Sequence, residues 1–287
     1  MLRNLSVFYR KPKPINTLQF ARKMHVDYIP MRWGRGDNYC YILTDDKTKE
    51  SWVIDPAQPE EVIPVLAEKF SGLKFTAVVN THHHYDHSDG NTSMLEYFKK
   101  IYGEDLPVYA GEDSPKVTLT PKHLDHLSLG TSIEIQAIHT PCHTMDSICW
   151  YAVDKHTGEK VLFSGDTIFH LGNGRFFEGT GAQMTKVMME TIPDNVDKQT
   201  KIYPGHEYTA SNAEFAKSVM PKSIALSNYI SKFTGKEFTC GMFNLQDELD
   251  ANPFFRLDDP EILIATKGQG KSQSEIMDTL RTMKNKF

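Results

Sequence analysis

The stretch Thr81-His82-His83-His84-Tyr85-Asp86-His87 decides how the rest of the chain is interpreted. It directly follows residues 75–79, a β-branched and apolar run typical of a strand. Where such a strand ends, His82 and His84 can point to one side and bind a single ion, while Asp86 and His87 turn toward a second position. Imidazole nitrogens and carboxylate oxygens are ligands for zinc, iron and manganese. The spacing H-x-H-x-D-H therefore predicts a metal centre.

Three residues downstream are candidates to complete this centre, because one ion takes about four ligands. His143 lies in Thr-Pro-Cys-His-Thr, Asp166 in Phe-Ser-Gly-Asp-Thr, and His206 in Tyr-Pro-Gly-His-Glu. Each follows a predicted strand or a glycine turn, so its side chain is free to project into a cleft. Together with the first cluster, they give seven candidate ligands.

The hydrophobic pattern divides the chain into a strand-rich part and a helical part. Short apolar runs predict a hairpin and further strands, and helical spacing predicts two helices among them. The predicted strands are 38–43, 51–54, 75–79, 107–110, 133–139, 148–153, 161–164 and 201–203, with helices at 60–70 and after residue 91. Beyond residue 208 the pattern is helical, with helices predicted at 210–219, 223–233 and 273–283.

The composition is that of an ordinary globular protein, since 39% of the 287 residues are hydrophobic and 24% are charged. No run approaches the ~20 apolar residues that a membrane-spanning helix needs, so we expect no membrane partner. The net charge of −5 gives no reason to expect a nucleic acid partner. The four cysteines form no C-x-x-C pair, which predicts reduced thiols. Nothing in the sequence bears on oligomeric state, and a monomer is our expectation.

The first 23 residues differ from the rest in charge. They hold six basic residues and no acidic one, whereas the remainder has 26 bases and 37 acids, a formal charge of −11. Such a leader is typical of a mitochondrial targeting peptide, although a basic tail with no targeting role remains the alternative. Met24 follows directly, and a second start there would give a cytoplasmic form. We therefore expect a mitochondrial matrix protein, a cytoplasmic protein, or both.

The order of the seven candidate ligands resembles that of the metallo-β-lactamase superfamily. Within it, the chain is similar to the glyoxalase II (hydroxyacylglutathione hydrolase) family at residues 81–91, 140–147, 165–169, 174–180 and 203–209, and at Asn252-Pro253-Phe254. The resemblance extends from Met24 onward. It implies an α+β fold, with an αββα sandwich as the catalytic domain at 24–207 and a smaller α-helical substrate-binding domain at 208–287.

The resemblance also implies a centre of two divalent metal ions, with zinc as the first candidate and iron or manganese as alternatives. His82, His84 and His143 would bind one ion and Asp86, His87 and His206 the other, with Asp166 bridging them. Asp86 and Asp166 would be the catalytic carboxylates. Metal-bound hydroxide would hydrolyse a thioester without a serine or cysteine nucleophile. The implied reaction converts S-D-lactoylglutathione to D-lactate and glutathione, the second step of methylglyoxal detoxification.

Glutathione is anionic, so its pocket needs cations and hydrogen-bond donors. The resemblance assigns this role to Arg175, Tyr208, Arg281 and Lys284. Arg281 and Lys284 are three residues apart on a predicted helix, and so share one face. Phe177 is the fifth predicted substrate-binding residue; it stands where many relatives have tyrosine, so one hydroxyl contact to glutathione is absent.

Two other functions remain as alternatives. A persulfide dioxygenase of the same superfamily uses one iron and a glutathione-derived substrate, but it would not need every ligand of the second group. A non-catalytic metal-binding protein is the other, although inactive relatives usually lose ligands and this chain keeps all seven. The formal charge of −11 beyond residue 23 disfavours an RNA-processing nuclease, because RNA is itself anionic.

The basic leader generates a prediction about targeting. A fluorescent protein fused to residues 1–30 should enter mitochondria, because six positive charges without an acidic residue precede Met24. Replacing Met24 with leucine in the full chain should selectively reduce any cytoplasmic form. Fluorescence microscopy and fractionation measure both effects, and a fusion that stays diffuse in the cytosol would contradict the targeting role.

Overall fold

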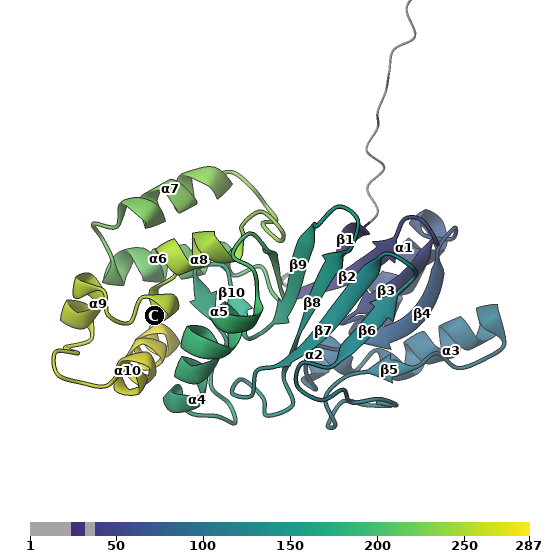
Figure 1. Ribbon diagram of the computed structural model, residues 1–287, viewed down its shortest axis with the longest axis horizontal. Helices are drawn as coiled ribbons and strands as arrows, with labels where there is room; N and C mark the ends of the chain where they lie inside the picture. Colours follow the sequence, from purple (N-terminus) through teal and green to yellow (C-terminus); the bar gives the residue numbers. More distant parts are fainter. Residues whose placement is uncertain (1–23, 32–37) are drawn as a thin grey trace, which may run out of the picture.

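Two five-stranded β-sheets pack face to face, and helices cover the outer face of each (Figure 1). The computed structural model describes residues 24–31 and 38–287. The predicted leader at 1–23 lies outside these described residues. The strand order is β1-β2-β3-β4-β5 in the first sheet and β12-β9-β8-β7-β6 in the second.

The first sheet contains the predicted hairpin, because β2 and β3 pair antiparallel across residues 41–54. β4 joins β3 in parallel and ends immediately before the histidine cluster. Its strands are β1 (Met24–Met31), β2 (Asn38–Asp45), β3 (Glu50–Ile54), β4 (Lys74–Val79) and β5 (Val108–Tyr109). Helices α1 (Pro59–Lys69) and α3 (Asn91–Tyr102) pack on its outer face through Val62, Leu66 and Phe98.

The second sheet is an antiparallel meander from β6 to β9, to which β12 adds in parallel. Its strands are β6 (His126–Leu129), β7 (Ile133–His139), β8 (Ile148–Asp154), β9 (Lys160–Gly165) and β12 (Lys201–Pro204). Between β9 and β12 the chain forms a small hairpin of β10 (Ile168–Phe169) and β11 (Gly172–Asn173). It then forms α4 (Gly181–Lys186), a π-helical turn (Val187–Thr191) and α5 (Ile192–Asn195), none of which the sequence pattern predicted.

Large aromatic side chains fill the space between the two sheets. Trp52 of the first sheet meets Trp150 of the second edge to face, with ring centroids 6.0 Å apart, and both rings are fully buried. Such pairs add about 0.5–1.5 kcal/mol to the free energy of burial. This core fixes the two sheets against each other, and so fixes the relative positions of the loops at their ends.

The C-terminal helices cover the outer face of the second sheet and share its hydrophobic core. Phe215 and Leu280 belong to one continuous buried cluster with Ile138 and Leu162 of the sheet. The elements are α6 (Thr209–Val219), α7 (Ile224–Phe233), α8 (Leu245–Ala251), a 3₁₀ turn (Pro253–Phe255), α9 (Pro260–Ala265) and α10 (Gln273–Lys286). Among the described residues, no helix combines the length and apolar character needed to cross a bilayer.

Candidate metal centre

The seven predicted ligands lie at one edge of the sandwich, where strands of both sheets end. β4 leads into His82 and His84, and the short helix α2 (Tyr85–Ser88) carries Asp86 and His87. His143 follows β7, Asp166 follows β9, and His206 follows β12. The structure therefore brings together residues that are up to 124 positions apart in the sequence.

Two glycines allow these strand ends to approach closely. A Cβ atom on Gly205 would lie 2.5 Å from Oδ1 of Asp166 and 2.7 Å from the ring of His87. Gly165 has φ +48°, and a Cβ there would lie 2.5 Å from the hydroxyl of Thr81. Only a residue without a side chain fits at either position.

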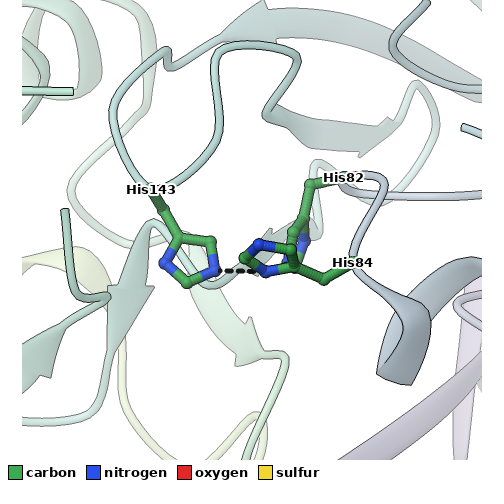
Figure 2. Close-up of side chains that lie close together, drawn as sticks. All are labelled: His82, His84 and His143. Atoms are coloured by element: carbon green, nitrogen blue, oxygen red, sulfur yellow. Dashed lines mark hydrogen bonds between the residues drawn. The ribbon is translucent and has the colours of Figure 1, made fainter. Parts of the chain in front are cut away.

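The first group of ligand atoms comes from His82, His84 and His143, whose rings converge in Figure 2. Nδ1 of His84 is 3.1 Å from Nε2 of His82 and 3.0 Å from Nε2 of His143. All three ligand atoms lie within 4.8 Å of one another. Three imidazole nitrogens facing a common point are a typical divalent metal site.

The second group consists of Asp86, His87 and His206, and the carboxylate of Asp166 lies between the two groups. Oδ1 of Asp166 is 3.4 Å from Nε2 of His87, and Oδ2 is 3.4 Å from Nε2 of both His143 and His206. Within the described residues, Oδ1 of Asp166 is buried without a hydrogen-bond partner. A buried carboxylate oxygen needs compensation, so this donor set fits divalent cations.

Burial and neighbouring charges shift the pKa values of the predicted ligands in different directions. Burial, reinforced by neighbouring histidines, holds the pKa of His82 well below its ordinary value. Burial opposes ionisation of Asp166, but His206 and His87 outweigh it, so the pKa of this carboxyl lies well below its usual range. For His87, burial lowers the pKa, but the carboxylates of Asp166 and Asp55 raise it to about 9.

Two polar residues that orient the ligands were not identified from the sequence. Asp55 is fully buried and accepts hydrogen bonds from Nδ1 of His87 (2.9 Å), and from the backbone N–H (2.8 Å) and hydroxyl (2.7 Å) of Thr81. Asn38 donates to the backbone carbonyl of Asp86 at 2.9 Å and faces its carboxylate at 3.4 Å. Such partners orient metal ligands. The sequence signal was only that Asp55 ends a strand before a proline.

His83 points away from the centre. Its Nδ1 lies 2.8 Å from Asp146 and its Nε2 lies 3.5 Å from Glu178. Asp113, Asp146 and His83 form a further group of possible ligands at the rim. The alternation of orientation between His82, His83 and His84 agrees with the register that the H-x-H spacing implies.

A cavity of about 570 Å³ opens beside the centre. Five of the predicted ligands and all five predicted substrate-binding residues line it: His84, Asp86, His143, Asp166 and His206, with Arg175, Phe177, Tyr208, Arg281 and Lys284. Tyr208 stacks parallel to His206 with ring centroids 4.6 Å apart, and Phe177 lies 5.3 Å from the rings of both His84 and His143.

Three cationic side chains, those of Arg175, Arg281 and Lys284, line this cavity. Burial, together with the nearby Arg175, lowers the pKa of Arg281 to about 10. Burial, together with Arg281, lowers the pKa of Lys284 to about 8. Three cations held this close together disfavour one another, and a bound anion relieves the repulsion.

Comparisons with known proteins agree with this geometry. Residues 33–206 match the model of the metallo-beta-lactamase superfamily, and residues 207–287 match that of the hydroxyacylglutathione hydrolase C-terminus. The chain is 47% identical to the cytoplasmic isozyme of hydroxyacylglutathione hydrolase from Saccharomyces cerevisiae, over 92% of this chain and 100% of that one. It is 42% identical to the mitochondrial hydroxyacylglutathione hydrolase of the same yeast, over 93% and 98%.

Among solved structures, ETHE1 from Myxococcus xanthus is similar over 91% of both chains, with a TM-score of 0.61 and 22% identity. This likeness concerns the fold. The sandwich and its histidine-rich edge define a metallo-beta-lactamase superfamily protein with a divalent metal site. The chain belongs to the hydroxyacylglutathione hydrolase family, the thioester hydrolases also called glyoxalase II. The fold class and enzyme class expected from the sequence are thereby confirmed.

The raised pKa of His87 predicts that zinc binding releases a proton. Without metal, His87 is protonated below pH 9, and its Nε2 must lose that proton to bind an ion. Zinc affinity should therefore fall about tenfold per pH unit as the pH drops from 8 to 6. Calorimetric titration of the metal-free protein with zinc, in buffers of different ionisation enthalpy at pH 7.5, measures the released proton.

The matched variant is Asp55→Asn, which removes one of the three carboxylates that raise the pKa of His87. It should release fewer protons at the same pH. Zinc binding by the unchanged chain with no proton release at pH 7.5 would show that His87 is already neutral or is not a ligand.

Proposed function

We propose that the protein hydrolyses S-D-lactoylglutathione and similar 2-hydroxyacylglutathiones to the 2-hydroxy acid and glutathione. This would be the second step of methylglyoxal detoxification. The observation that carries the proposal is the cavity, because predicted metal ligands and the cations Arg175, Arg281 and Lys284 line the same space. A thioester of an anionic thiol carries the matching groups, which are a reactive carbonyl for the metal centre and carboxylates for the cations.

We propose a dinuclear centre, with one ion at His82, His84 and His143 and the other at Asp86, His87 and His206. The position of Asp166 between the groups supports its role as the bridge. When bound, the two cations would activate a water molecule near neutral pH and stabilise negative charge on the carbonyl oxygen. Zinc is the first candidate, and the same donors suit iron and manganese.

The residues of this chain bind and orient the substrate around that chemistry. Arg281 and Lys284 bind a carboxylate of glutathione, and Tyr208 and Phe177 add aromatic surfaces to the lining of the same cavity. Phe177 also packs against His84 and His143, which limits the access of water to their rings. The departing group is a thiolate, a good leaving group, so strong general-acid assistance is not required.

The two parts of the chain have different roles in the proposed function. Residues 24–207 supply the metal ligands and residues 208–287 supply Tyr208, Arg281 and Lys284. We propose that the protein works as a monomer without nucleic acid or membrane partners. We also propose that residues 1–23 direct part of it to mitochondria. The similar yeast proteins include a cytoplasmic and a mitochondrial enzyme, which supports both locations.

The central prediction is hydrolysis by a two-ion centre. The protein should hydrolyse S-D-lactoylglutathione, which is followed by the loss of the thioester absorbance. Metal analysis of the same sample should give two ions per chain. Asp166→Ala should lose most activity and part of the metal, because this carboxylate contacts both ligand groups. Full activity with one ion per chain would contradict the dinuclear centre. One iron per chain with oxygen uptake on a glutathione persulfide would support the dioxygenase instead.

A second prediction concerns thiol recognition. Lys284→Ala should raise KM with little change in kcat, because the contact exists in ground and transition states alike. A charge-assisted contact is worth ~1.5–3 kcal/mol, and partial exposure reduces it, so kcat/KM should fall about tenfold. Arg281→Ala should act in the same direction by tenfold to about a hundredfold. Lys284 is the cleaner test because Arg281 also donates to the carbonyl of Asn173.

The control for these variants is a thioester whose thiol lacks the glycine carboxylate. With that substrate, both variants should behave like the unchanged enzyme. A collapse of kcat at constant KM, or equal losses with both thioesters, would show that the basic pair has a structural role in α10.

A further inference from the structure

The segment from Phe169 to Arg175 runs along the wall of the cavity, between the second sheet and the C-terminal helices. Side chains of the helical region hold its backbone carbonyl groups. Asn212 donates to the carbonyl of His170 at 3.0 Å, and Asn252 donates to those of Gly172 at 2.9 Å and Phe169 at 3.3 Å. Arg281 donates to the carbonyl of Asn173 at 2.7 Å. The path of this segment therefore depends on residues 208–287.

Glu248 of α8 is the centre of these contacts. Its carboxylate is fully buried and accepts hydrogen bonds from the backbone N–H of Leu171 (2.9 Å), Nδ1 of His170 (2.9 Å), the amide of Asn252 (3.0 Å) and the hydroxyl of Tyr229. A buried carboxylate is tolerated only when its oxygens are well hydrogen-bonded. Four donors from three elements meet that requirement.

Leu171 shows why the segment has to be held. It is fully buried and has φ +58°, in the left-handed region that bulky side chains disfavour. Such a conformation persists only where surrounding contacts impose it. The hydrogen bond from its N–H to Glu248 is one of those contacts.

The other end of the segment reaches a predicted metal ligand. Nδ1–H of His143 donates to the backbone carbonyl of Arg175 at 2.8 Å. This bond leaves Nε2 of His143 to face His84, 3.0 Å from its Nδ1. Gly174 touches the same ligands, since a Cβ there would lie 2.0 Å from the carbonyl oxygen of Asp166 and 2.8 Å from Nδ1 of His143. A shift of the segment would therefore turn the His143 ring.

We infer that Glu248 is a positioning residue for the metal centre: by fixing the 169–175 segment, it orients His143 and sets the metal affinity of the His82, His84 and His143 group. This inference rests on the proposed metal centre. It adds that the helical region, besides binding the thiol, determines how tightly a site on the catalytic sheets holds its ion. The hydrogen-bond partners of Glu248 in the described part of the chain are His170, Leu171, Tyr229 and Asn252, so its effect on His143 passes through the segment and the Arg175 carbonyl.

The test is zinc affinity of the full-length chain, measured by competition with a chromophoric chelator. Glu248→Gln keeps the size of the side chain but replaces one acceptor oxygen with an N–H₂ group facing donors. Loss of a partner that orients a ligand typically costs 10- to 100-fold in metal affinity, so one zinc equivalent should weaken by about that factor. The other equivalent, at Asp86, His87 and His206, should stay tight. Zinc binding requires no hydrolysis assay.

Two further variants serve as a control and as an alternative test of the segment. Glu261→Gln changes a half-buried carboxylate of α9 that accepts from the backbone N–H of Lys222, and it should bind zinc like the unchanged chain. Asn212→Ala removes a single bond to the segment and should weaken zinc several-fold. It decides the question if Glu248→Gln does not fold.

The outcomes separate this inference from the proposed function. If the unchanged chain binds no zinc, the metal centre itself is wrong. If it binds zinc and Glu248→Gln lowers only the melting temperature, with zinc affinity unchanged, Glu248 has a purely structural role and the inference fails. An equal loss of affinity in Glu261→Gln would also overturn it, because that residue does not touch the segment.

Discussion

The buried carboxylate of Asp166, placed between two groups of imidazoles, is the constraint around which the rest of the structure is organised. Its two oxygens lie 3.4 Å from His87 on one side and from His143 and His206 on the other. A charge this deeply buried is stable only beside compensating charges. The loops that carry these residues must therefore converge, and Gly165 and Gly205 allow them to do so without steric conflict.

Convergence of the loops requires that the strands end at fixed positions. The aromatic contact of Trp52 with Trp150 holds the two sheets together. On the outer face of the second sheet, a separate hydrophobic core joins the sheet to the helical region. Because close-packed interiors transmit small displacements, the positions of the ligands depend on packing far from them. Asp55 and Asn38 then fix individual rings and carboxylates within that frame.

The cavity is lined by two groups of side chains with opposite preferences for bound charge. Burial lowers the pKa of His82, His84 and His143, and these imidazoles beside ionised Asp166 attract cations. Burial and mutual repulsion lower the pKa values of Arg281 and Lys284, and a bound anion would relieve that repulsion. The first group comes from strand ends and the second mainly from α10, so residues from both parts of the chain line one cavity.

The chemistry of the site could be predicted from the amino-acid sequence, because ligand type is a property of the side chains and H-x-H-x-D-H places four donors within six residues. Local periodicity also predicted the β2–β3 hairpin, the strand of 133–139 and helix α10. It missed the helices between 181 and 195, because a π-helical turn followed by Pro193 breaks the regular spacing. The contacts that orient the ligands could not be predicted in this way, because they join residues far apart in the sequence. Asp55 contacts His87 across 32 residues and Glu248 contacts His170 across 78, and no local pattern records such pairs because packing alone brings them together.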